Sequence, residues 1–119
     1  MTTFDLKIRT KEFAIDTVKF IKSLPNDETG RTIKYQLVKS ATSVAANYSA
    51  VCRARSDREF IAKLQIVLEE SDESHFWFEM INELSLSNQT SKNKYLLKEA
   101  DELTSIFVTS LKKIKARSK

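Results

Sequence analysis

The chain of 119 residues contains a single glycine, Gly30, and a single proline, Pro25. Turns, bulges and barrel corners use these two residues heavily, whereas long helices avoid them. Their scarcity therefore predicts a mostly helical chain with short connections, and it excludes a Rossmann fold, a P-loop and a β-barrel. The length fits one domain, residues 1–119, that is large enough for a proper core.

The most regular helical pattern lies between Glu28 and Ala54. Apolar residues recur there at spacings of three and four, which predicts a helix with one buried seam. Small side chains surround this seam on its other sides and allow neighbouring backbones to approach closely. We therefore expect this helix to have neighbours on more than one side. The seam consists of Ile33, Leu37, Ala41, Val44, Tyr48 and Val51.

A first helix is predicted over Phe4–Leu24. It ends there because Pro25 disfavours the helical conformation of the residue before it, and turn-forming residues follow. Five apolar residues fall on one face of this helix and are predicted to point into the core, whereas Phe20 falls off that face. The five residues are Phe13, Ala14, Val18, Ile21 and Leu24.

A third helix is predicted over Asp57–Leu84. Ser56 and Glu59 fit a capping box, in which the serine accepts from the amide three residues on and the glutamate reaches back. A polar loop, Ser85–Lys94, is expected before a fourth helix over Tyr95–Ile114, and the basic residues beyond it are expected to fray. Four helices with short links predict an all-α fold, an antiparallel up-down-up-down four-helix bundle.

The inward faces of the last two helices follow the same spacing. The third helix is predicted to bury Phe60, Leu64, Val67, Ser71, Ser74, Phe78 and Ile81, and the fourth Leu96, Ala100, Leu103, Phe107, Leu111 and Ile114. Phe76 and Phe78 nevertheless point roughly 160° apart, because each helical residue turns by about 100°. One monomeric core cannot bury both sides of an outer helix, so the aromatic residues predict an oligomer.

Charge is segregated along the chain, which has 20 basic and 16 acidic residues and a formal charge of +4. Arg31–Leu68 and Ser110–Lys119 are rich in cations, whereas Glu69–Leu84 carries acidic residues and no basic one. The arginines are expected either to pair with the acidic helix of the same or a neighbouring subunit, or to bind nucleic acid together with the C-terminal lysines. The candidate nucleic-acid contacts are Arg53, Arg55, Arg58, Lys63, Lys112, Lys113, Lys115, Arg117 and Lys119.

The sequence contains no recognisable catalytic constellation. The single histidine, His75, follows Asp72 instead of the glutamate that a carboxylate-bridged di-metal bundle requires at that spacing, and no second helix carries a matching pair. A hydrolytic or metal site around Asp72, Glu73 and His75 remains an alternative that would require bound metal. Cys52 beside Arg53 is either a thiol of lowered pKa or, more simply, a packing residue.

No cofactor, metal, small-molecule substrate or membrane contact is expected. The lone cysteine, Cys52, cannot form an internal disulfide, and no stretch approaches the ~20 apolar residues of a membrane span. The N-terminal segment also lacks the apolar centre of a signal peptide. These features predict a cytoplasmic protein.

Residues Ala41–Glu79 read ATSVAANYSAVCRARSDREFIAKLQIVLEESDESHFWFE. This stretch resembles the small bacterial four-helix-bundle proteins named for the intervening sequences of 23S ribosomal RNA, and the similarity extends more weakly over nearly all of the chain. The resemblance implies an antiparallel bundle that assembles into a homopentameric, barrel-like ring. It also implies kinship with the accessory variability protein of diversity-generating retroelements, which is basic and works with a reverse transcriptase and nucleic acid.

We therefore expect a non-enzymatic, homo-oligomeric protein that acts as a binding or assembly module. Eight residues are predicted to lie at subunit or helix contacts: Asn47, Tyr48, Arg53, Arg55, Glu70, Glu73, Phe76 and Trp77. The alternative is a basic accessory factor that binds RNA, DNA or a nucleic-acid enzyme through its cationic residues.

Overall fold

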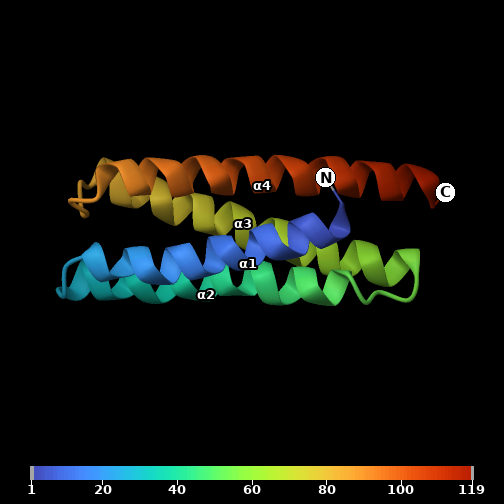
Figure 1. Cartoon of the computed structure of the whole chain (residues 1–119), viewed down its shortest axis with the longest axis horizontal. Coiled ribbons are helices and arrows are strands. Elements are labelled where there is room, and N and C mark those ends of the chain that lie inside the picture. Colours follow the sequence, from blue (N-terminus) through green and yellow to red (C-terminus); the bar gives the residue numbers. More distant parts are fainter. Residues whose placement is uncertain (1, 119) are drawn as a thin grey trace.

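The computed structural model describes residues 2–118, which form four long helices. They are α1 (Thr3–Phe20), α2 (Glu28–Val51), α3 (Asp57–Glu83) and α4 (Thr90–Arg117), and a short 3-10 helix, η1 (Ile21–Ser23), follows α1. The helices lie along one axis, so the molecule is a rod with extents of 48 × 21 × 19 Å (Figure 1). The start of α1 and the end of α4 lie toward the same end of this rod (Figure 1).

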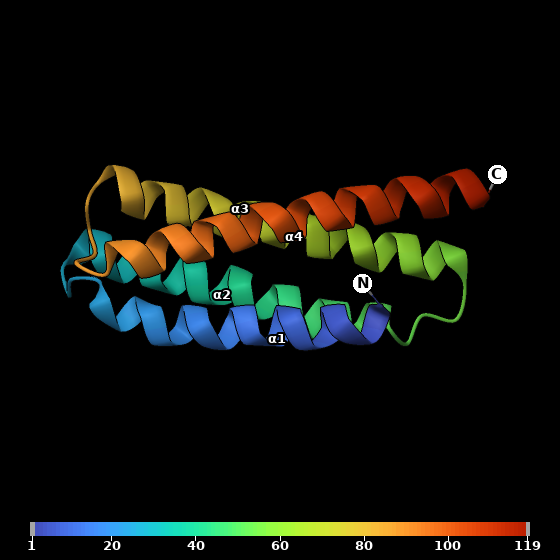
Figure 2. The ribbon, with the colours of Figure 1, turned by 45° about the horizontal axis from the view of Figure 1, so that its top comes forward.

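Each helix packs against the next one in the chain, and α1 also packs against α4. Successive helices run in opposite directions, as two views of the ribbon show (Figures 1 and 2). This confirms the predicted all-α, up-down four-helix bundle. The six predicted seam residues of α2 and the six of α4 are all buried. Because α2 contacts both α1 and α3, the expectation of neighbours on more than one side is also correct.

The predicted inward face of α1 is partly wrong. Phe20 is buried in the core, whereas Val18 is exposed. The true inward residues follow a four-three spacing in which two threonines, Thr10 and Thr17, occupy core positions. Each threonine hydroxyl donates to a carbonyl of its own helix, Thr17 to Phe13 at 2.8 Å, so neither buries an unpaired polar group.

The predicted bounds of α4 are also wrong. The helix begins at Thr90, five residues before the expected start, and Asn93 of its first turn is buried. It continues to Arg117, past the expected end at Ile114. The described part of the tail is therefore helical, and hydrogen bonds from Arg117 and Ser118 to Asp57 of α3 hold its end.

Short side-chain contacts set the helix ends. The Ser56 hydroxyl accepts from the Glu59 amide at 3.1 Å, which confirms Ser56 as the N-cap of α3. The expected return bond to the Glu59 carboxylate is absent among the described residues, and that carboxylate lies 4.0 Å from Arg55 instead. At the start of α2, the Asp27 carboxylate accepts from the Gly30 amide at 2.8 Å. A Cβ atom on Gly30 would lie 1.9 Å from the Pro25 carbonyl oxygen, so the α1–α2 turn requires glycine there.

Candidate interaction surfaces

The outer surface between α2 and α3 gathers five of the eight residues predicted at contacts. The Ser40 hydroxyl bonds to Ser74 of α3, so this side of α2 faces α3. Ser43 and Asn47 follow Ser40 at helical spacing and therefore lie on the same side. Glu70, Glu73 and Trp77 lie on the matching side of α3 by the same spacing, with Phe76 at its outer edge. We call Ser43, Asn47, Glu70, Glu73, Phe76 and Trp77 the α2–α3 face.

Trp77 has an unpaired polar group at this face. Its indole Nε1 is buried without a hydrogen-bond partner among the described residues, although the rest of the side chain is partly exposed. Phe76 is 49% exposed and packs edge-on against the indole, with ring centroids 4.9 Å apart. The chain itself already encloses the indole nitrogen, whereas the half-exposed Phe76 ring is typical of a surface that another molecule covers.

The carboxylates of the same face repel each other. Burial raises the pKa of the Glu70 carboxyl, and the neighbouring Glu73 adds to the rise, while Lys39 of α2 opposes it. Asn47 uses its amide nitrogen to donate to the Ser43 carbonyl at 2.9 Å. This hydrogen bond lies within α2, so it leaves the outer surface open to another helix.

The other three predicted contact residues lie elsewhere. Tyr48 is in the core, where its ring lies 5.8 Å from that of Phe107 in α4. Arg53 and Arg55 lie in the α2–α3 connection, and Arg53 donates to Ser49 at 3.1 Å. Tyr48 is therefore a contact between helices of one chain, whereas the two arginines belong to a different surface.

That second surface is one end of the rod, where α2 ends, α3 begins and α4 ends (Figure 2). The antiparallel order brings together two cationic stretches that are far apart in the sequence. We call this surface the basic end, and its cations are Arg53, Arg55, Arg58, Lys63, Lys112, Lys113, Lys115 and Arg117. Lys119, which was predicted to belong with them, lies outside the described residues.

Two carboxylates partly balance the basic end. Asp57 accepts from Arg117 at 2.9 Å and from the Ser118 hydroxyl at 2.8 Å, and the hydrogen bonds from Ser118 and Arg117 lower the pKa of its carboxyl. Arg55 Nε lies 4.0 Å from Glu59. Within the described chain, the arginines of the basic end form no ion pair with Glu69–Leu84, so pairing with that acidic stretch across subunits remains a prediction.

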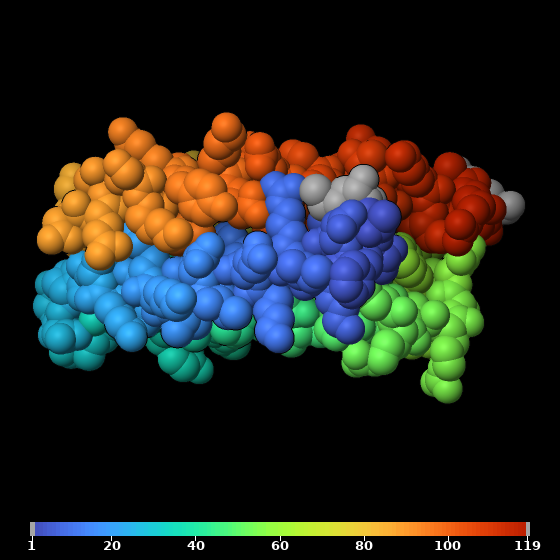
Figure 3. All heavy atoms as spheres, viewed as in Figure 1, coloured from blue at the N-terminus to red at the C-terminus, as the bar shows by residue number. Residues whose placement is uncertain are grey.

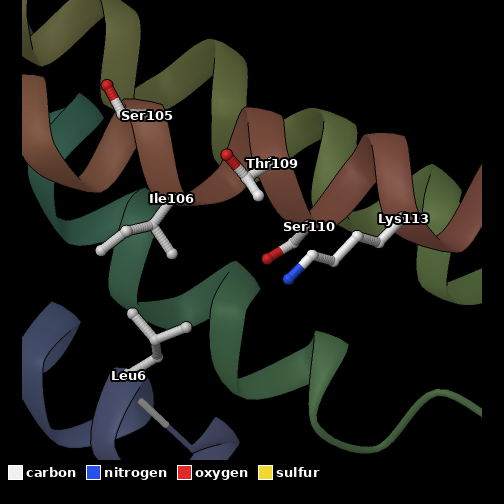
Figure 4. Close-up of a pocket in the computed structure, with 6 residues that line it drawn as sticks. All are labelled: Leu6, Ser105, Ile106, Thr109, Ser110 and Lys113. Atoms are coloured by element: carbon white, nitrogen blue, oxygen red, sulfur yellow. The ribbon is translucent and has the colours of Figure 1, made fainter.

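A groove of about 370 Å³ opens beside this end, between the start of α1 and the C-terminal half of α4. Leu6 of α1 faces Ile106 of α4, and the Ser110 hydroxyl and the Lys113 ammonium lie along the α4 edge (Figure 4). The groove exists because α1 begins well short of the point that α4 reaches (Figure 1). A groove lined by three hydroxyl side chains, two apolar ones and a lysine therefore adjoins the basic end.

The residues of the hydrolytic alternative are not assembled into a site. His75 Nδ1 lies 3.3 Å from a Glu79 oxygen, and among residues 2–118 no three His, Cys, Asp or Glu side chains are placed to hold a metal ion. Cys52 is partly buried and packs against the core, as the simpler interpretation expects. No described helix is both long and apolar enough to cross a membrane.

Two exposed apolar surfaces were not predicted from the sequence. Phe4, Ile8, Ile15 and Val18 form a stripe on the outer side of α1, the helix in the foreground of the space-filling view (Figure 3). Tyr35 of α2 is 66% exposed and stands among cations. The sequence did carry a signal for the stripe, because its four residues recur at helical spacing on the side of α1 opposite the core. This second periodicity becomes visible only once Thr10 and Thr17 are assigned to the core.

The fold defines a small four-helix-bundle protein with an exposed aromatic ring on α3 and a cluster of cations at one end. The chain belongs to the 23S rRNA-intervening sequence protein family, whose model matches residues 3–109. This confirms the resemblance found in the sequence. No similar sequence is found among curated proteins.

The bundle is also similar to a solved crystal structure, that of a protein with unknown function from the S23 ribosomal protein family of Bacteroides thetaiotaomicron VPI-5482. The two chains share 26% sequence identity, and the match covers 90% of this chain and 98% of that chain with a TM-score of 0.80. The same architecture thus extends over nearly the whole length of both proteins.

Proposed function

We propose that this protein is a homo-oligomeric binding module of the cytoplasm, a ring of helical bundles that works by assembly and not by catalysis. The observation that carries the proposal is the α2–α3 face, where the half-exposed Phe76 packs edge-on against the Trp77 indole. An isolated subunit would leave half of this aromatic ring in water. A neighbouring subunit that packs on it would bury the apolar surface.

The experiment measures solution mass by multi-angle light scattering for Trp77→Ala and Phe76→Asp. We expect both variants to shift the mass toward that of the monomer, while circular dichroism shows the helices intact. Phe76→Asp is the safer variant for folding, because half of the side chain already lies in water. Tyr95→Asp is the matched control, since Tyr95 of α4 is 55% exposed and lies outside the α2–α3 face.

If Tyr95→Asp keeps the wild-type mass, the lower mass of the other two variants comes from the loss of the interface and not from a general loss of folding. The proposal fails if the wild-type protein is monomeric, or if Phe76→Asp and Trp77→Ala both retain the wild-type mass.

A second candidate function is nucleic-acid binding through the basic end. It is supported by eight cations that gather where α2 ends, α3 begins and α4 ends, opposed there by Asp57 and Glu59. Repetition around a ring would produce a multivalent, phosphate-binding surface, and counterion release would make its affinity fall steeply with salt. Arg117 contributes least, because Asp57 already neutralises it.

The test is a titration of RNA and of DNA at several salt concentrations. We expect the triple variant K112A/K113A/K115A to bind more weakly and to lower the salt slope by about one for each phosphate that it no longer binds. The control K92A/K94A/K98A removes three lysines from the opposite end of the same helix. Equal losses in both variants, or a wild-type affinity independent of salt, would refute this function.

A further inference from the structure

A groove on the outer side of α2 combines an apolar floor with three cations. Ile21, Tyr35 and Val38 form the floor, Arg31, Lys34 and Lys39 stand around it, and its volume is about 540 Å³. Lys34 and Arg31 donate to Asn26, an uncharged residue of the α1–α2 turn. None of the three cations forms an ion pair with a carboxylate in the part of the chain that the structure describes.

The second half of α3 carries a surface of the opposite character. Phe76, Met80 and Leu84 follow one another at four-residue spacing, and Phe76 and Leu84 are each 49% exposed. The carboxylates Glu73, Glu79 and Glu83 flank this line and are all exposed. We call these six residues the α3 patch. Its three negative charges match the three positive charges of the α2 groove.

The two surfaces lie at the same level of the rod. The Ser74 hydroxyl donates to Ser40 at 2.8 Å and fixes α2 against α3 at this point. Arg31 lies nine residues before Ser40, and Glu83 lies nine residues after Ser74. Because the two helices are antiparallel, both steps run in the same direction along the rod and cover the same distance, about 14 Å at 1.5 Å per residue. A rotation about an axis parallel to the rod can therefore bring one surface onto the other without a shift along the rod.

We infer that the α2 groove of one subunit receives the α3 patch of a second copy of this chain. The inference rests on the proposed self-assembly and identifies the two surfaces that meet. Such contacts join different surfaces of the two copies, and they form a closed ring when successive rotations return to the start. Aromatic and apolar side chains fill the centre of the contact, and opposite charges at its edge select the partner.

Charge reversal followed by charge restoration tests the pairing. K34E/K39E places two negative charges beside the floor of the groove, and E73K/E83K places two positive charges on the α3 patch. Each double variant is expected to lower the light-scattering mass toward that of the monomer. A quadruple variant that carries both pairs of substitutions restores opposite charges across the contact and is expected to recover the wild-type mass. The control K94E/K98E on α4 has the same net charge as K34E/K39E and is expected to keep the wild-type mass.

The outcomes separate the inference from the proposal on which it rests. A monomeric wild-type protein overturns both. A wild-type oligomer whose mass neither reversal changes overturns the pairing of these surfaces and leaves self-assembly standing. The pairing is also overturned if both reversals dissociate the oligomer and the quadruple variant stays dissociated, because the reversed surfaces would then not face each other. The inference requires that both double variants dissociate and that the quadruple variant recovers the wild-type mass.

Discussion

Ser40 and Ser74 meet in the interior of the bundle with their hydroxyl oxygens 2.8 Å apart. Both residues are fully buried, and the Ser40 hydroxyl also lies 3.2 Å from the Leu37 carbonyl oxygen. The contact requires two small side chains, because the backbones of α2 and α3 must come close for hydroxyl groups to meet. It therefore fixes the level of one helix against the other.

Substitution of Ser74 by leucine should destabilise the bundle by about 1–3 kcal/mol, because the larger side chain has no space in a packed contact. Ser74→Ala should cost only about 1 kcal/mol, since Ser40 retains the Leu37 carbonyl as an acceptor. Urea unfolding with a common slope measures both values. Equal stability of the leucine and alanine variants would show that the contact is loosely packed.

Gly30→Ala should destabilise the protein by about 1–3 kcal/mol. The added methyl group would meet the Pro25 carbonyl oxygen, a backbone atom that cannot move without opening the α1–α2 turn. Thr29→Ala is the control at an exposed neighbouring position and should change the unfolding free energy by less than about 0.5 kcal/mol. A Gly30→Ala variant as stable as the wild type would contradict the tight approach.

Arg9 of α1 and Glu99 of α4 close the bundle with a two-pronged ion pair. The guanidinium donates to the two carboxylate oxygens at 2.7 and 2.6 Å, and it also reaches Glu102 at 2.9 Å. The Glu99 side chain is 14% exposed, so this pair is less screened by water than a surface pair. A double-mutant cycle with Arg9→Gln and Glu99→Gln should yield a coupling of about 1–2 kcal/mol. A coupling near zero would mean that solvent compensates for the pair.

Stability should fall at high pH through Tyr48. Burial, with a smaller contribution from Cys52, raises the pKa of this phenol to about 12 from its ordinary value near 10. The unfolded chain then loses the proton first, so the folded state is destabilised as pH rises from about 10 to about 12, by up to about 1.4 kcal/mol per pH unit. Tyr48→Phe lacks this contribution. Unfolding curves between about pH 9 and about pH 12.5 should diverge for the two proteins, and parallel curves would contradict the assignment.

Helical periodicity predicted α2 and the inward face of α4 because their core positions are apolar. It failed on α1 for a definite physical reason. Thr10 and Thr17 satisfy their hydroxyls within the helix and can therefore occupy core positions that a count of apolar residues assigns to the outside. The start of α4 was misplaced because Thr90–Lys94 is polar and carries no proline or glycine that would mark the boundary.

The candidate surfaces were only partly visible in the sequence. The aromatic and acidic residues of α3 indicated an interface, which stays a prediction, and Asn47 lies on the side of α2 that faces α3. The basic end required the antiparallel order, which brings the start of α3 to the end of α4, where Arg117 bonds to Asp57. The α2 groove was missed, because Tyr35, Lys34 and Lys39 resemble ordinary solvent-exposed residues until the level of α3 is known.

The central claim of self-assembly is tested most directly by the light-scattering mass of the full chain over a range of protein concentrations. One subunit has a mass of 13.7 kDa. We expect a stable particle of about five times this mass, the ring size that the family resemblance implies, at moderate salt and without added RNA. A mass of one subunit at every concentration would contradict the account.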